Sequence, residues 1–212
     1  MNLFFDLDGT LINSLHRHYV VLMKALRNEK INIEVDENEY LNTKREGLSN
    51  KKFLSEKYDL PQSDLNRANE YWIDHIEDEQ FLRLDSLYKD SVPTLLLLEN
   101  VNNIFFLTAR KNKTGLENEL FFLKLKQFCD QLFIVDPECG QENKKEILSH
   151  YDKKNTMMIG DTEADYTAAL DNGIRSYILN RGLRNKSFGD KRKVISYEDL
   201  GGLYSSINKE NF

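Results

Sequence analysis

The sequence has few cysteines, few prolines and no long apolar run, and each shortage excludes a class of protein. Its two cysteines, Cys129 and Cys139, lack the paired spacing of a zinc site or a disulfide framework, so we expect a protein of the reducing cytoplasm. The longest apolar runs, 95–98 and 104–107, are far shorter than the roughly 20 residues of a membrane span, and the first residues do not resemble a signal peptide. Acidic residues outnumber basic ones by 35 to 29, which argues against a nucleic-acid partner held by bulk charge.

The composition favours a folded chain, and the apolar residues follow two kinds of periodicity. Apolar residues make up 40% of the 212 residues, enough for a sizeable core in one large domain that carries an insert. Residues 15–84 show helical periodicity, whereas short apolar runs alternate with helical patterns after residue 88. Such alternation is typical of a parallel sheet covered on both faces. We therefore predict an α/β fold with a Rossmann-like parallel sheet core, residues 1–14 and 89–212, interrupted by a helical insertion, residues 15–88.

Individual elements follow from local signals. The expected strands are 2–5, 103–107, 132–135, 156–159 and 176–179, and the expected core helices are 95–98, 113–127, 142–151 and 163–172. A Ser-Tyr-Glu-Asp run resembles a capping box and predicts a last helix beginning at Ser196. The cation-rich stretch 181–193 is expected to be a solvated loop.

Four carboxylates lie where predicted strands end: Asp6, Asp8, Asp161 and Asp165. Ligands of open α/β sheets bind at the carboxyl ends of the strands, so we expect these side chains to lie close together. Converging carboxylates repel one another and raise each other's pKa. The simplest resolution is a hard divalent cation with oxygen ligands, which is the preference of Mg²⁺.

These residues resemble the motifs of a known family. The run Asp6-Leu7-Asp8-Gly9-Thr10-Leu11, Thr108 after its apolar run, Lys144, and Gly160-Asp161 followed by Asp165 resemble, in order, the four motifs of the haloacid dehalogenase-like hydrolase superfamily. The predicted insertion lies where that family's C1-type cap domain lies, as in members similar to phosphoglycolate phosphatase and β-phosphoglucomutase. An Asp at position 8 resembles the phosphatases and phosphomutases of the family, since dehalogenases do not need an acid there.

The resemblance implies a Mg²⁺-dependent phosphatase that acts on a small phosphorylated metabolite. From the acidic balance and the short apolar runs we expect no nucleic-acid or membrane partner, and we expect a monomer or weak homodimer. Asp6 would be the nucleophile that forms an aspartyl-phosphate, and Asp8 would be general acid and then general base. The implied metal ligands are Asp6, Asp161, the backbone carbonyl of Asp8, and Asp165 through water or by orienting Asp161. The implied phosphate-binding groups are the Thr108 hydroxyl, the backbone N–H groups of Leu7, Asp8 and Ala109, and the Lys144 ammonium.

Several assignments stay open from the sequence. Lys145 is an alternative to Lys144 as the site lysine, and Arg110 could bind a substrate anion or form a surface ion pair. Arg45, in a predicted loop 43–49 of the insertion, is a candidate substrate contact or a solvated cation. Two other functions remain: a sugar-phosphate mutase of the same superfamily, and a non-catalytic receiver or binding module in which Asp6 is phosphorylated as a signal.

Overall fold

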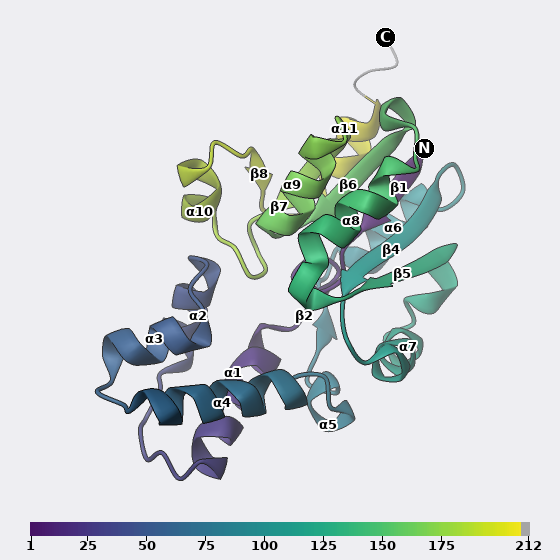
Figure 1. The fold of residues 1–212 in the computed structure, drawn as a ribbon. Helices are drawn as coiled ribbons and strands as arrows, with labels where there is room; N and C mark the ends of the chain where they lie inside the picture. The colour runs from purple at the N-terminus through teal and green to yellow at the C-terminus, as the bar shows by residue number, and fades with distance from the viewer. Residues whose placement is uncertain (209–212) are drawn as a thin grey trace.

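A six-stranded sheet forms the centre of the protein in the computed structural model, which describes residues 1–208 (Figure 1). Its strands, in spatial order, are β5 (Gln131–Val135), β4 (Asn103–Ala109), β1 (Asn2–Phe5), β6 (Thr156–Gly160), β7 (Arg175–Leu179) and β8 (Ser196–Tyr197). Every neighbouring pair is parallel. Parallel strands need crossover connections, and these supply the covering helices. The prediction of a Rossmann-like α/β fold is confirmed.

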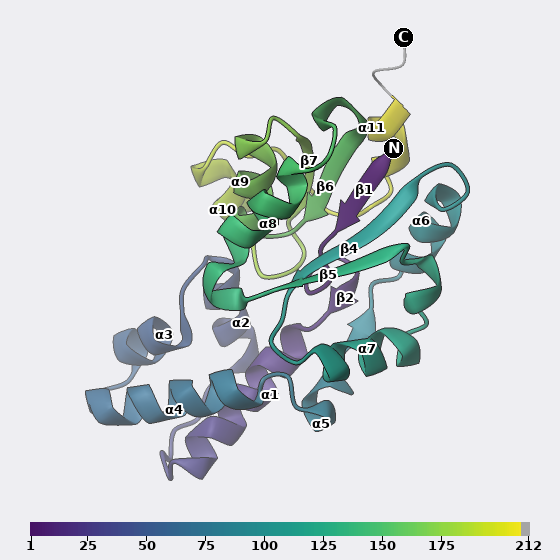
Figure 2. The same ribbon diagram turned by 45° about the vertical axis from the view of Figure 1, so that its right-hand side comes forward.

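Apolar side chains of the central strands alternate between two helical layers. Leu3 and Phe5 of β1 pack with α6 (Ser91–Leu98), α7 (Lys113–Phe122) and α11 (Leu203–Asn208). Phe4, which points to the opposite face, packs with α8 (Gly140–Ser149) and α9 (Glu163–Asp171). Figure 2 shows α8 and α9 on one side of the sheet and α6 and α7 on the other. Because β1 is buried on both faces, it reads in the sequence as a continuous apolar run.

Along the chain, a group of helices is inserted between β1 and the other strands of the sheet, and these helices lie beside the sheet (Figure 1). This helical insertion consists of α1 (Leu15–Asn28), α2 (Glu37–Arg45), α3 (Asn50–Lys57), α4 (Gln62–His75) and α5 (Glu79–Leu82). It has its own apolar cluster, built around Leu22, Leu26, Tyr40, Phe53 and Leu65. The chain enters and leaves it through β2 (Ile12–Asn13) and β3 (Ser86–Leu87), which pair with each other. No helix within residues 1–208 is both long enough and apolar enough to cross a membrane.

Two predicted core helices differ from the structure. The helix expected over 113–127 ends at Phe122, because Lys124 takes a left-handed conformation with φ 56°, and a 3-10 turn follows at Lys126–Phe128. The helix expected to begin at Ser196 is wrong, because Ser196 and Tyr197 pair with β7 as strand β8. Tyr197 also stacks on Tyr177, with ring centroids 3.9 Å apart, and this packing prevails over the capping pattern.

The stretch 181–193 is also more ordered than a solvated loop. It contains α10 (Lys186–Lys191) and begins with Arg181, whose guanidinium donates to Asp90 at 2.6 and 2.7 Å and to the Thr10 carbonyl at 2.5 Å. The same guanidinium lies 4.1 Å from the centre of the Tyr88 ring. Arg181 therefore holds the start of this stretch against the segments that connect the sheet to the helical insertion.

Candidate active site

The register of the three central strands brings the predicted site residues to one edge of the sheet. Phe5 is level with Phe106 of β4 and Ile159 of β6, so the carboxyl ends of the three strands lie side by side. The backbone N–H of Asp6 donates to the Ile159 carbonyl at 2.8 Å, which extends the pairing by one residue. A tight turn then reverses the chain, with Gly9 at a φ of 78° that favours glycine.

Three buried carboxylates and one buried ammonium form the centre of the site. Asp6, Asp161 and Asp165 each place an oxygen within 4.8 Å of the others. The Nζ atom of Lys144 donates to Asp6 Oδ1 at 2.8 Å and to Asp165 Oδ1 at 2.6 Å. All four side chains are almost fully buried. Lys145, the alternative from the sequence, is exposed and pairs with Asp171.

Burial and mutual repulsion perturb the ionisation of this cluster. Burial, together with the nearby Asp165 and Asp8, raises the pKa of Asp6 to about 7, even though Lys144 acts in the opposite direction. Burial and the charges of Asp6 and Asp165 raise the pKa of Asp161 well above its usual range. Burial disfavours the charged form of Lys144, but the two carboxylates outweigh burial and raise its pKa. The cluster therefore has more negative charge than one lysine balances.

The carboxylate arrangement fits a divalent cation. Asp161 Oδ2 accepts from the backbone N–H of Leu183 at 2.6 Å, while its buried Oδ1 has no hydrogen-bond partner among the described residues. A buried, unpartnered carboxylate oxygen is costly unless a cation contacts it. Asp6 and Asp161 supply the hard oxygen ligands that Mg²⁺ prefers.

Both carboxylate oxygens of Asp165 already accept hydrogen bonds. Oδ1 accepts from Lys144, and Oδ2 accepts from the backbone N–H of Thr162 at 3.1 Å and from its hydroxyl at 2.9 Å. These contacts form a capping box at the start of α9. Asp165 thus has the geometry of a residue that orients its neighbours.

The backbone packs closely over Asp161. A Cβ atom on Gly182 would lie 2.2 Å from Asp161 Oδ2 and 2.4 Å from Gly9 Cα, and Gly9 likewise leaves no room for a side chain. Two turns of the chain, after β1 and after β7, therefore meet above this carboxylate and fix its position.

Asp8 lies beside this cluster but between two arginines. Its Oδ2 accepts from Arg110 Nε at 2.6 Å, and its Oδ1 forms a short ion pair with Arg17 Nη2. Burial alone would raise the pKa of Asp8, but Arg110 and Arg17 reverse the effect and hold it well below its usual range. The carboxylate is therefore ionised in this arrangement.

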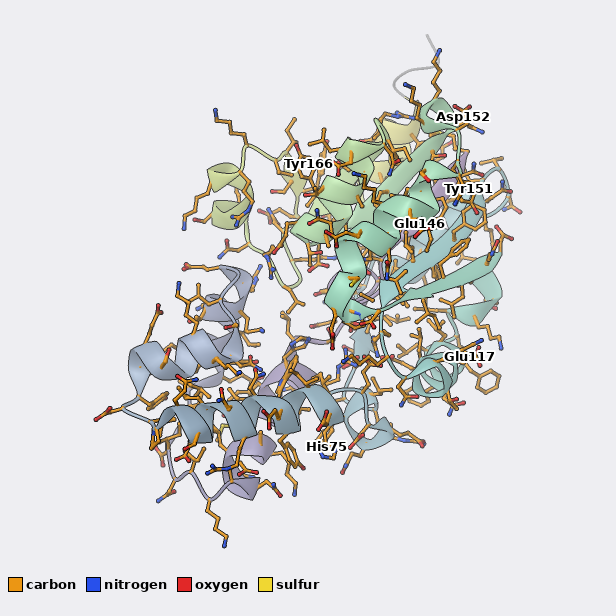
Figure 3. All side chains as sticks on the ribbon, viewed as in Figure 1. His75, Glu117, Glu146, Tyr151, Asp152 and Tyr166 are labelled. Carbon is orange, nitrogen blue, oxygen red and sulfur yellow. The ribbon has the colours of Figure 1, made fainter. Side chains whose placement is uncertain are left out.

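A cavity of about 590 Å³ opens onto both the Asp6 carboxylate cluster and Asp8 with its two arginines. Asp6, Asp8, Thr108 and Lys144 line its floor, and Trp72, Ile73 and Ile76 of α4 line the side formed by the helical insertion. Figure 3 shows side chains projecting into the space between α4 and the sheet, with His75 at the end of α4. The cavity therefore lies between the helical insertion and the edge of the sheet that carries Asp6 and Asp8.

The remaining predicted site residues do not all line the cavity. Thr108 is buried at the cavity, and Ala109 also lines it. Leu7 has its side chain in the apolar core and is not among the residues that line the cavity. Arg110 is buried against Asp8, which excludes the surface ion pair considered from the sequence. Arg45 is not among the cavity-lining residues; it ends α2 and its Nη2 donates to the Asn180 carbonyl at 2.7 Å.

Arg17 is the site residue that the sequence analysis missed. It lies on α1, is almost fully buried and lines the cavity. A signal was present, because the buried positions Val21 and Ala25 lead back by the same four-residue step to Arg17. A cation on the buried side of an amphipathic helix is a candidate for a buried ion pair.

Solved structures with the same fold include several hydrolases. A haloacid dehalogenase-like family protein from Streptococcus pneumoniae has a TM-score of 0.75 at 16% identity, with 97% of each chain covered. A predicted phosphatase from Clostridium acetobutylicum has a TM-score of 0.75 at 18% identity, also with 97% of each chain covered. A predicted phosphoglycolate phosphatase from Haemophilus somnus has a TM-score of 0.68 at 16% identity, covering 97% of this chain and 96% of its own.

No curated protein is recognisably similar to this sequence. The sequence profile described as haloacid dehalogenase-like hydrolase matches residues 3–179, which include the sheet edge, the helical insertion and all four carboxylates. The predicted resemblance is confirmed: the chain belongs to the haloacid dehalogenase-like hydrolase family.

Proposed function

We propose that the protein is a Mg²⁺-dependent phosphatase that hydrolyses a small-molecule phosphomonoester through an aspartyl-phosphate on Asp6. The observation that carries the proposal is the buried Asp6 carboxylate beside Asp161 and Lys144, at the floor of a cavity large enough for a metabolite. Family membership and the phosphatases among the structural neighbours support the same reaction class. The helical insertion would act as the cap domain that excludes bulk water from the site.

In the first step, a carboxylate oxygen of Asp6 attacks phosphorus, and the bond from phosphorus to the leaving alcohol oxygen breaks. Lys144 orients Asp6 through its 2.8 Å hydrogen bond and adds positive charge near the phosphoryl oxygens. The buried Thr108 hydroxyl and the backbone of Leu7 and Ala109 would donate to those oxygens. A cation held by Asp6 and Asp161 would screen the repulsion between carboxylate and phosphate.

Asp8 would handle the proton in both steps. It gives a proton to the leaving alcohol oxygen, then takes one from the water that attacks the phosphorus of the aspartyl-phosphate. The bond between phosphorus and Asp6 breaks, and inorganic phosphate and the free carboxylate result. In this structure Asp8 is held as an anion by Arg17 and Arg110, so the side chain must leave both arginines before it can act as an acid.

Hydrolysis of p-nitrophenyl phosphate, with Mg²⁺ and with EDTA, tests the proposal, followed by a screen of phosphorylated metabolites for phosphate release. We expect turnover that needs Mg²⁺, and we expect Asp6→Asn to abolish it while the exposed variant Asp59→Asn keeps it. Full activity of Asp6→Asn, or equal activity in EDTA, would contradict the proposed chemistry.

A further inference from the structure

Two arginines from distant parts of the chain meet on one carboxylate beside the candidate nucleophile. Arg17 belongs to α1 of the helical insertion, and Arg110 follows β4 of the sheet. Their side chains are each 2% exposed, and both hold Asp8, Arg110 through a 2.6 Å hydrogen bond and Arg17 through a shorter contact. Both line the cavity that also contains Asp6.

Two further acidic side chains lie next to the arginines. Arg17 Nε lies 3.4 Å from Asp85 Oδ1, and Arg110 Nη2 lies 3.1 Å from Glu119 Oε2. Asp85 and Glu119 are themselves buried. Each guanidinium therefore lies in contact with both Asp8 and a second acidic side chain.

The arginines have more donors than Asp8 uses. Arg17 Nη1 and Arg110 Nη1 are buried without a hydrogen-bond partner among the described residues, whereas Arg17 Nε and Arg110 Nη2 face Asp85 and Glu119. Unpartnered buried donors are costly, because each has lost its water. Both arginines line the cavity, so a ligand that takes the place of Asp8 would meet guanidinium groups with spare hydrogen-bonding capacity.

The proposed reaction requires Asp8 to leave this position, and a replacement must then satisfy the arginines. We propose that Arg17 and Arg110 bind a carboxylate on the leaving-alcohol part of the substrate, and that in the free protein the Asp8 carboxylate occupies this subsite. The inference rests on the proposed phosphatase function and adds its substrate class, a phosphomonoester whose alcohol carries a carboxylate.

A carboxylate is the group that fits best, because the site already holds one. Arginine donors match the two oxygens of a carboxylate, and the charge-assisted hydrogen bonds are stronger than neutral ones. The apolar wall of Trp72, Ile73 and Ile76 leaves room for the carbon atoms that join the two anionic groups. Substrate binding would then both fill the subsite and release Asp8 toward the leaving oxygen.

A matched pair of substrates tests the inference on the unmodified protein. 2-Phosphoglycolate and 2-hydroxyethyl phosphate differ in a carboxylate and a hydroxyl on the same short carbon chain. We expect kcat/KM to be roughly 10- to 100-fold higher for 2-phosphoglycolate, the range expected for hydrogen bonds between a carboxylate and arginine. Equal kcat/KM for the two substrates would overturn the subsite.

Arg110→Gln tests the assignment to these residues. We expect this variant to lose most of the preference for 2-phosphoglycolate, mainly through KM, while the preference survives in Arg83→Gln, which removes an exposed arginine paired with Glu79. If Arg110 served only to position Asp8, kcat would fall equally for both substrates and the preference would stay, which would refute the proposal.

A binding measurement covers the case in which Arg110→Gln does not fold. Calorimetry on the unmodified protein with Mg²⁺ compares phosphonoacetate with 2-hydroxyethylphosphonate, neither of which can be hydrolysed at its P–C bond by this reaction. At least about tenfold tighter binding of phosphonoacetate supports the subsite, and equal binding overturns it. Failure of the phosphatase proposal gives a different result, because p-nitrophenyl phosphate would then not be hydrolysed at all.

Discussion

Replacing Asp6 by Asn is predicted to change the pH dependence of stability as well as activity. The buried carboxyl group of Asp6 has a pKa of about 7 in the folded protein against 3.8 for the ordinary group. The folded state therefore binds this proton more tightly, and stability falls as pH rises from 3.8 to 7. An amide does not ionise, so the variant is spared this loss.

The size of the effect follows from the shift. The wild type loses about 1.4 kcal/mol per pH unit at this group from pH 5 until the pH approaches the pKa of about 7, and little above it, which gives about 2.5 kcal/mol between pH 5 and pH 8. We expect Asp6→Asn to gain about that much relative to wild type between pH 5 and pH 8. Urea denaturation in EDTA measures the free energy of unfolding, with the fluorescence of the single tryptophan, Trp72, and far-UV circular dichroism as independent probes.

A control variant and the addition of Mg²⁺ complete this experiment. Asp59→Asn, which removes an exposed carboxylate, should follow the wild type at both pH values. Mg²⁺ should stabilise the wild type at pH 8 and have little effect on Asp6→Asn, because a bound cation relieves the repulsion that the amide has already removed. A stability difference between Asp6→Asn and wild type that is the same at pH 5 and pH 8 would refute the buried, repulsive carboxylate cluster.

Three further substitutions probe other parts of the site. Lys144→Met should lower kcat for p-nitrophenyl phosphate by at least about 100-fold, because a hydrogen-bond donor aimed at the phosphate is lost. Lys145→Met should have no effect, because Lys145 is exposed and pairs with Asp171. Equal rates for the two variants would contradict the choice of Lys144 as the site lysine. Burial raises the pKa of Asp85 to about 9, so the folded protein loses stability as pH rises from 3.8 to 9. In urea denaturation, the free energy of unfolding of Asp85→Asn should rise relative to wild type by up to roughly 1.4 kcal/mol per pH unit between pH 5 and 8. Parallel pH profiles of the two proteins would exclude a raised pKa at Asp85. Gly182→Ala should cost roughly 1–3 kcal/mol and weaken the Mg²⁺-induced rise in Tm, because its Cβ would crowd Asp161 Oδ2; an unchanged Tm and Mg²⁺ response would show that the backbone there yields easily.

The sheet and the centre of the site were predictable because their signals are local. Each apolar run that ends in a polar residue, as before Asp6 and Asp161, marks a buried strand and the edge at which it stops. Parallel neighbours must end on the same side, so the convergence of Asp6, Thr108 and Asp161 follows from strand order. The family resemblance then gave each residue an expected role, and those roles remain predictions.

The contacts of Arg17 and Arg110 with Asp8 were not predictable, because they join residues far apart in the chain. Arg110 and Asp8 are separated by 102 positions, and no periodicity links them. The capping pattern at Ser196 failed for a related reason, since a cross-strand contact with β7 prevails over a weak local preference. For Arg45 the sequence leaves a substrate contact and a solvated cation open, because its contact with Asn180 depends on the path of the chain after β7.

The paired strands β2 and β3 have a consequence for how this protein can diversify. Ile12 lies opposite Leu87, so the two ends of the segment between them are held side by side outside the six-stranded sheet. Changes in the length or sequence of that segment can therefore be accommodated without shifting the strands that lead to Asp6 and Asp161. The insertion's share of the cavity wall can change during evolution while the carboxylates at the sheet edge keep their positions.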